Sequence, residues 1–188
     1  MSLLPKAQSV TQQGASDGYV PPMAFRSQVL DGGYTRLEIS TPPSKLQAVH
    51  QQLAKLLTPP LKIRYIKQVD RQSGQQLEKP ESYVAVELST ERVIQTLDFC
   101  SELFYHDGRN ALWLRGLDNA QLILDEIGML YIYPDDFIFR DALASLGWVE
   151  AEHQTIADRD YVLVNFSAQA DELEQSLIQS LGMVYWGG

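Results

Sequence analysis

The chain has 188 residues, 45% of them hydrophobic, which is enough to bury the core of one domain or of two small ones. Its apolar runs fall well short of the roughly 20 residues that span a bilayer, which excludes a membrane-spanning segment and favours a soluble cytoplasmic protein. A single cysteine, Cys100, excludes an internal disulfide and a cysteine-based zinc site.

The net charge of −9 is unevenly distributed along the chain. Residues 1–80 hold ten Lys and Arg against five Asp and Glu, whereas residues 81–188 hold five against nineteen. The acidic second half repels phosphate backbones, so the composition disfavours a nucleic-acid partner unless the basic first half acts alone. The same charge fits either a solvated surface without a role or association with a basic protein partner.

Residues 1–23 are rich in Gln, Ser, Gly and Pro without apolar periodicity, which predicts a flexible N-terminal arm. Residues 34–40 then read as a strand, and Thr41-Pro42-Pro43 favours the start of a helix with a leucine and valine stripe. Two strands over residues 61–65 and 83–88, a helix after the cap Ser89-Thr90 and a strand over 111–115 follow.

This order, strand, helix, strand, strand, helix, strand, is typical of the ferredoxin-like split βαβ arrangement, and we assign residues 24–116 to a first half of that type. Asp118 with Gln121 three residues later is typical of a helix start, so residues 117–127 are expected to form a linking helix.

Residues 128–188 repeat the pattern. Met129–Tyr133 is predicted as a strand buried on both faces, and a helix follows over 136–146 with Asp135 as its N-cap. Further strands are expected over 148–152, 161–166 and 183–186, with a helix over 168–181. The similar segments Ser145–Val149 and Ser180–Val184 indicate an internal duplication.

The predicted fold class is therefore α+β, with two tandem ferredoxin-like βαββαβ halves, each an antiparallel sheet with helices on one face. The alternative is one continuous mixed sheet covered by helices.

Catalytic signals are weak. The carboxylates Asp125, Glu126, Asp135 and Asp136 are the best acid-base or metal candidates, but calcium-loop spacing is absent and a helix start accounts for Asp135-Asp136. The three histidines show no metal-pair spacing, and the chain has neither a phosphate-binding glycine loop nor a dinucleotide fingerprint. We therefore expect no cofactor, no metal site and no catalytic residue.

The leading hypothesis is a non-catalytic protein-binding module of the inhibitor or immunity type, whose acidic second half meets a basic partner. Its expected contact residues are the four carboxylates and two strand aromatics: Asp125, Glu126, Asp135, Asp136, Trp113 and Trp148. A regulatory domain that binds a small ligand between the halves, or across a homodimer, is the first alternative. A metal-dependent enzyme that uses the acidic cluster is the second.

Overall fold

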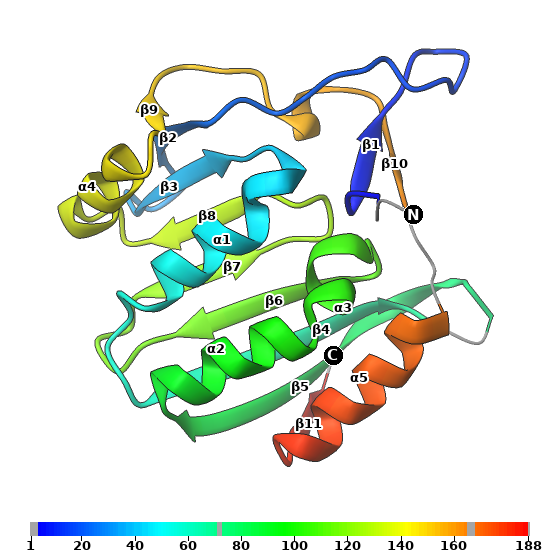
Figure 1. The fold of residues 1–188 in the computed structure, drawn as a ribbon, viewed down its shortest axis with the longest axis vertical. Coiled ribbons are helices and arrows are strands. Elements are labelled where there is room, and N and C mark those ends of the chain that lie inside the picture. Colours follow the sequence, from blue (N-terminus) through cyan, green and yellow to red (C-terminus); the bar gives the residue numbers. More distant parts are fainter. Residues whose placement is uncertain (1–3, 71–72, 165–167, 188) are drawn as a thin grey trace.

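The computed structural model describes residues 4–70, 73–164 and 168–187. Within these ranges nine strands form one continuous sheet in the order β11-β5-β4-β6-β7-β8-β3-β2-β9 (Figure 1). All neighbours are antiparallel except β2 and β9, so the sheet is mixed. The strands are β2 (Ala24–Val29), β3 (Thr35–Ser40), β4 (Leu61–Val69), β5 (Gln76–Leu88), β6 (Asn110–Arg115), β7 (Gln121–Leu124), β8 (Leu130–Tyr133), β9 (Val149–Glu150) and β11 (Val184–Gly187).

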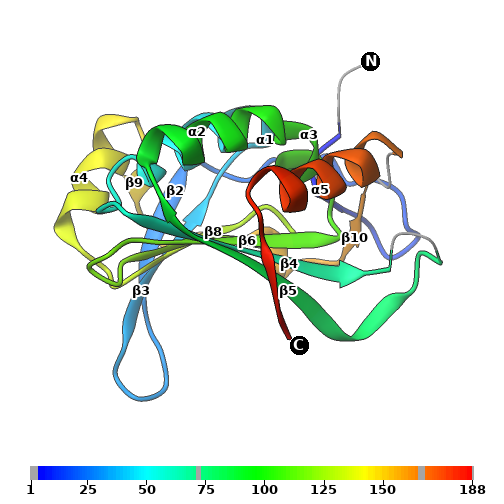
Figure 2. The same cartoon turned by 90° about the horizontal axis from the view of Figure 1, so that it is seen from below.

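Five α-helices accompany the sheet within the same ranges: α1 (Pro43–Ala54), α2 (Thr90–Phe99), α3 (Ser101–His106), α4 (Phe137–Ser145) and α5 (Ala168–Ser180). Figure 2 shows α1, α2, α3 and α5 over one face of the sheet, with α4 at the end that carries β9. None of the described helices covers the opposite face. None has the length and apolar character needed to cross a membrane. The fold class is α+β, with one covered and one uncovered sheet face.

Side-chain alternation in the central strands produces both faces. The residues that point toward the helices are apolar and fully buried: Leu112 and Leu114 of β6, Leu122 and Leu124 of β7, and Leu130 and Ile132 of β8. The residues between them point the other way and are half-buried, including Trp113, Ile123 and Tyr131, which lie directly opposite one another across the three strands. The two-residue alternation of side chains in these strands therefore places apolar residues in the core and half-buried residues on the uncovered face.

The strand and helix predicted on either side of Pro134 are confirmed, with two corrections. Asp136, not Asp135, is the N-cap of α4, because its Oδ1 accepts a hydrogen bond from the Ile138 amide at 3.0 Å. The strand is also not buried on both faces, because helices cover one face of the sheet and leave the tyrosines of β8 half-buried on the other.

The predicted linking helix over residues 117–127 is wrong, because this segment contains β7, which pairs with β6 and β8. Asp118 does not cap a helix. Its Oδ1 accepts from the amide of Ala120, two residues on, and closes the turn that leads into β7. Leu122 and Leu124 are two residues apart, a spacing that fits a strand with one buried face.

The flexible arm is also wrong for much of residues 1–23. β1 (Ala7–Ser9) pairs with β10 (Tyr161–Leu163) in a separate two-stranded sheet, at the upper right of Figure 1. Lys6 is buried, and its ammonium group donates to the Asn110 carbonyl at 2.8 Å. Pairing with a distant strand thus orders a segment that has little local propensity of its own.

The strands do not separate into two halves. Three strands of the second half belong to the large sheet: β8 pairs with β3 and β7, β9 pairs with β2, and β11 pairs with β5. The fourth, β10, pairs with β1 in the small sheet. The main hydrophobic core is shared as well, because it takes side chains from Phe25 through to Met183. The single continuous mixed sheet, the alternative arrangement, is the one observed. The internal duplication stays a prediction.

We expect Leu122→Ala to destabilise the fold by about 2–5 kcal/mol, because it opens a cavity under the helices. Ile123→Ala, the matched control on the uncovered face, should cost clearly less because Ile123 is only half-buried. Urea unfolding of both variants measures the difference. Equal losses would contradict the alternation in β7.

Candidate functional site

A groove of about 600 Å³ crosses the uncovered face of the sheet. Its floor is formed by residues of β6, β7 and β8, and its walls by residues of β3, β4 and β5. The lining residues are Arg36, Ile66, Gln68, Pro80, Ala111, Trp113, Gln121, Ile123, Asp125, Glu126, Tyr131 and Tyr133. Residues from before and after position 116, where the predicted first half ends, therefore line the same groove.

Arg36 lies against two tyrosines of the floor. Its guanidinium carbon is 4.2 Å from the ring centroid of Tyr131 and 5.8 Å from that of Tyr133, and it donates a 2.7 Å hydrogen bond to the Tyr133 hydroxyl. The Nη2 atom of Arg36 is 4.0 Å from the Oε2 atom of Glu38, which is at the limit of ion-pair distance. These contacts fix a positive charge beside the aromatic floor.

Asp125 and Glu126 lie at the other end of the groove, in the turn between β7 and β8. The Asp125 carboxylate accepts from the amides of Ile127 at 3.0 Å and Met129 at 2.8 Å. Glu126 accepts from the side-chain amide of Gln68 at 3.0 Å. The groove is therefore polarised, with a guanidinium group on one side and two carboxyl groups at one end.

Burial and, to a smaller extent, the neighbouring Glu126 charge raise the pKa of Asp125 to about 7, although its two amide donors and Lys6 oppose the shift. Burial also lowers the pKa of Lys6 to about 8, against the attraction of Asp125, Asp107 and Glu126. The groove thus contains a carboxyl group that changes its charge near neutral pH.

The predicted contact residues do not all converge. Trp113 lies in the groove with Asp125 and Glu126, whereas Asp135 and Asp136 follow the far end of β8. Asp135 pairs with Arg140, which donates from Nε at 2.6 Å and from Nη2 at 2.5 Å, and these bonds lower the pKa of the carboxyl. The four carboxylates therefore form two separate pairs, and in the described ranges no three His, Cys, Asp or Glu side chains are placed to hold a metal ion.

Trp148 is not available to a partner. It is 5% exposed, and its indole Nε1 donates to the Ser40 carbonyl at 3.0 Å. The prediction of Trp148 as a contact residue is wrong, because its ring belongs to the hydrophobic core. In contrast, the sequence analysis does not predict Arg36 and Gln68 as site residues. Each precedes a buried residue in its strand, so a strand pattern could have indicated that their side chains lie on the face opposite the core.

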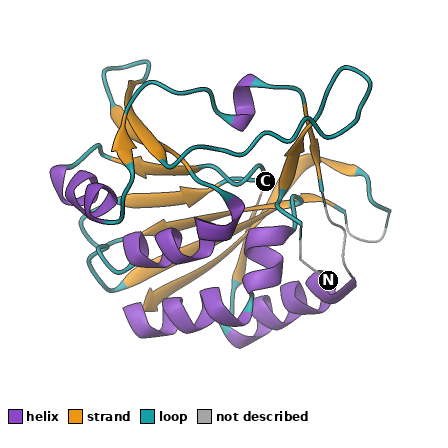
Figure 3. Ribbon diagram, turned by 45° about the horizontal axis from the view of Figure 1, so that its top comes forward, coloured by secondary structure: helices purple, strands orange, loops and turns teal. Residues whose placement is uncertain are grey.

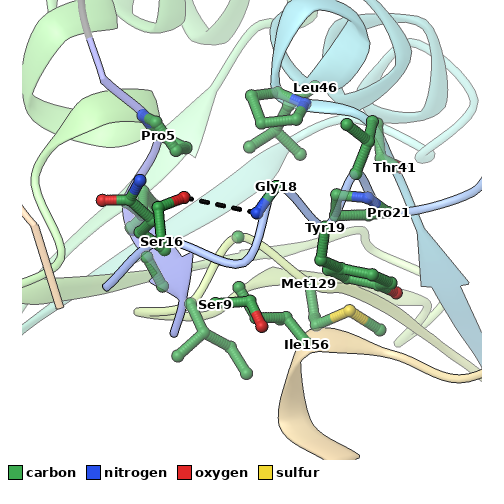
Figure 4. A pocket seen from close by; sticks show the side chains of 17 residues that line it. Pro5, Ser9, Ser16, Gly18, Tyr19, Pro21, Thr41, Leu46, Met129 and Ile156 are labelled. Carbon is green, nitrogen blue, oxygen red and sulfur yellow. Dashed lines mark hydrogen bonds between the residues drawn. The ribbon is translucent and has the colours of Figure 1, made fainter. Parts of the chain in front are cut away.

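A second, smaller cavity of about 240 Å³ lies beneath the N-terminal segment, between β1 and the start of α1 (Figure 4). Figure 4 shows Pro5, Leu46, Met129 and Ile156 around it, and most of its wall is apolar. The Thr41 hydroxyl at its wall is buried and has no hydrogen-bond partner in the described residues. The cavity exists because residues 5–21 close over the core, which the expectation of a flexible arm could not anticipate.

No family model, curated protein or solved structure matches this chain. An aromatic floor, a fixed guanidinium group and a carboxyl pair can hold a flat ligand by stacking at its centre and by hydrogen bonds at its ends.

The raised pKa of Asp125 makes stability depend on pH. The unfolded carboxyl titrates near its ordinary pKa of 3.8 and the folded one near 7, so stability that depends on the protonated form is lost as pH rises through this interval. Asp125→Asn keeps an acceptor for the two amides, so its stability should exceed that of the wild type by an amount that grows from near zero at about pH 4 to on the order of 4 kcal/mol near pH 7. Urea unfolding across this interval is the measurement.

Asp118→Asn is the control, because it removes a carboxylate that also accepts a turn amide. If the advantage of Asp125→Asn over the wild type does not grow with pH, the raised pKa is contradicted.

Proposed function

We propose that this protein acts by binding a small organic ligand in the groove on the uncovered face of its sheet. The observation that carries the proposal is the groove itself, whose aromatic floor has the Arg36 guanidinium group on one side and the carboxyl groups of Asp125 and Glu126 at one end. Its volume of about 600 Å³ lies within the range of small-molecule sites. The sequence predicts a small-ligand site between two halves as its first alternative, and we place the ligand instead on one face of the single sheet, where residues 117–127 also line the groove.

The lining of the groove constrains the ligand. Trp113, Ile123 and Tyr131 form a row across three strands that favours a flat, apolar body. Asp125 and Glu126 favour hydrogen-bond donors at one end of that body. A ligand whose donor end meets these carboxyl groups would raise the fraction of Asp125 that is ionised, because donors stabilise the charged form.

The localisation that we propose for this function is the cytoplasm, since the chain has a single cysteine, Cys100, and therefore no internal disulfide. The thiol is fully buried beside α3, and burial raises its pKa to about 11, so it is an inert part of the core.

A groove-filling variant tests the proposal. Gln121 is half-buried on the uncovered face, and Gln121→Trp should fill the groove at little cost because strands accommodate aromatic residues there. We expect thermal-shift screening of a metabolite collection to yield ligands that raise the melting temperature of the wild type, and the variant to bind them at least about tenfold more weakly.

Val29→Trp is the matched control, because Val29 is 76% exposed on β2 and outside the groove. Ligands that stabilise the wild type and Gln121→Trp equally would place binding elsewhere and refute the proposal.

A second candidate function is the protein-binding module of the leading sequence hypothesis, now at the edge of the sheet that carries β9. Phe137 of α4 is 72% exposed and Val149 of β9 is 59% exposed, and Ile138 of α4 and Leu146, which caps its C-terminus, are exposed as well. Acidic side chains, including the exposed Asp141 and Glu150, belong to the same two elements. Exposed apolar residues with acidic neighbours suit a basic protein partner.

For this second candidate, we expect Phe137→Ser with Ile138→Ser to abolish co-purification of a basic partner while changing stability by less than about 0.5 kcal/mol. Wild-type association should also weaken steeply as salt rises. Tyr34→Ser, a change at another exposed aromatic in the β2–β3 turn, is the control. Association that survives both the substitutions and high salt would sink this candidate.

A further inference from the structure

Three cations surround Trp113 next to the groove. Lys62 lies directly opposite Arg115 in the β4–β6 pair, and Arg64 lies directly opposite Trp113. The guanidinium carbon of Arg64 is 5.3 Å from the Trp113 ring centroid. Together with Gln121, these residues line a pocket of about 250 Å³, which we call the basic pocket.

None of the three cations forms an ion pair with a carboxylate of the described residues. Arg64 donates to the Ser82 hydroxyl at 2.9 Å and 3.2 Å, and Arg115 donates to the side chain of Asn119. The ammonium nitrogen of Lys62 is 4.9 Å from the Trp186 ring centroid. The polar contacts of the basic pocket are therefore to neutral groups.

Other arginines of this chain behave differently. Arg26, Arg109, Arg140 and Arg159 each form an ion pair with at least one carboxylate at 3.2 Å or less. Acidic residues outnumber basic ones by 24 to 15, so carboxylates are plentiful as partners. Lys62, Arg64 and Arg115 differ from these four arginines, because they share one sheet face and pair with no carboxylate of the described residues.

The arrangement opposes folding. Like charges directly opposite each other on one face of an antiparallel pair destabilise it, and Lys62 and Arg115 occupy such positions. An anion between them would relieve the repulsion, and two guanidinium groups with an ammonium group suit phosphate oxygens, which accept several charge-assisted hydrogen bonds.

The basic pocket and the groove lie side by side, because both are lined by Trp113 and Gln121. β6 and β8 are two strand spacings apart, about 10 Å, which is of the order of the distance from phosphate to base in a mononucleotide. The carboxyl groups of Asp125 and Glu126 lie farther along the groove, where the amino groups of a base would donate to them.

We propose that the groove and the basic pocket together bind a mononucleotide, with its phosphate between Lys62, Arg64 and Arg115 and its base over the aromatic floor. This inference rests on the proposed ligand function and gives the ligand a chemical class. The acidic charge of the whole chain and the carboxyl pair at the end of the groove favour a single nucleotide over a nucleic-acid strand.

The test uses the full-length protein and three probes: adenosine monophosphate, adenosine and inorganic phosphate. Calorimetric titration should show that the monophosphate binds more tightly than either fragment. In Lys62→Ala with Arg115→Ala, affinity for the monophosphate should fall at least about tenfold, because two charge-assisted contacts are lost. Affinity for adenosine should stay within about twofold of the wild type.

Lys45→Ala with Lys55→Ala is the charge-matched control, because both lysines are exposed and lie on or next to α1, on the covered side of the sheet. This variant should bind all three probes as the wild type does. Without a probe, the melting temperature of Lys62→Ala with Arg115→Ala should equal or exceed that of the wild type, since the repulsion is removed.

The outcomes separate the two proposals. If the monophosphate binds no more tightly than phosphate, or if both double variants lose affinity equally, the nucleotide inference is overturned. If metabolites without an anionic group fill the groove and the monophosphate does not bind, the ligand function stands and the inference fails. If oligothymidine binds more tightly than the monophosphate, a nucleic-acid strand replaces the mononucleotide.

Discussion

Burial of one face of a single mixed sheet is the constraint on which the rest of this structure depends. The leucines of β6 and β7 and the apolar residues of β8 must lie under the helices, since each buried side chain contributes about 1.5–3 kcal/mol of hydrophobic stabilisation. Because strand side chains alternate, this requirement also places Trp113, Ile123 and Tyr131 on the opposite face. The groove is thus positioned by the packing of the core beneath it.

Polar groups at one end of the sheet join the N-terminal segment to this framework. Lys6 reaches Asn110 at the start of β6, and Asn110 in turn donates to the carbonyls of Leu103 and Asp107 at 3.0 Å. Asp107 and Arg109 form a buried ion pair nearby. Such a network costs desolvation and stabilises the fold only when its members are satisfied, so it holds β1 in one position.

Much of the fold could be predicted from local signals. Ser89 at a helix start and the alternation in β4 gave elements of the correct type. Leu122 and Leu124 were misassigned because Asp118 resembles a helix cap and only pairing with β6 and β8 shows that the segment is a strand. β1 depends on β10, a partner far away in the sequence, and no local pattern reveals such pairing. For the site, the sequence predicts Trp113, Asp125 and Glu126 as contact residues, and the structure brings these three together in the groove, although their role in contact stays a prediction. The burial of Trp148 depends on the packing of the core, and the position of Arg36 depends on the strand order.

Lys6 connects the N-terminal segment with the carboxyl end of the groove. Its ammonium group lies where it attracts the ionised form of Asp125, and the residue also lines the cavity beneath the N-terminal segment. Displacement of that segment would remove a positive charge from the neighbourhood of the groove and raise the proton affinity of its carboxyl group. Removal of Lys6 together with that segment would therefore change the electrostatics of a surface on the uncovered side of the sheet, although Lys6 itself directly precedes β1, which pairs with β10 elsewhere in the fold.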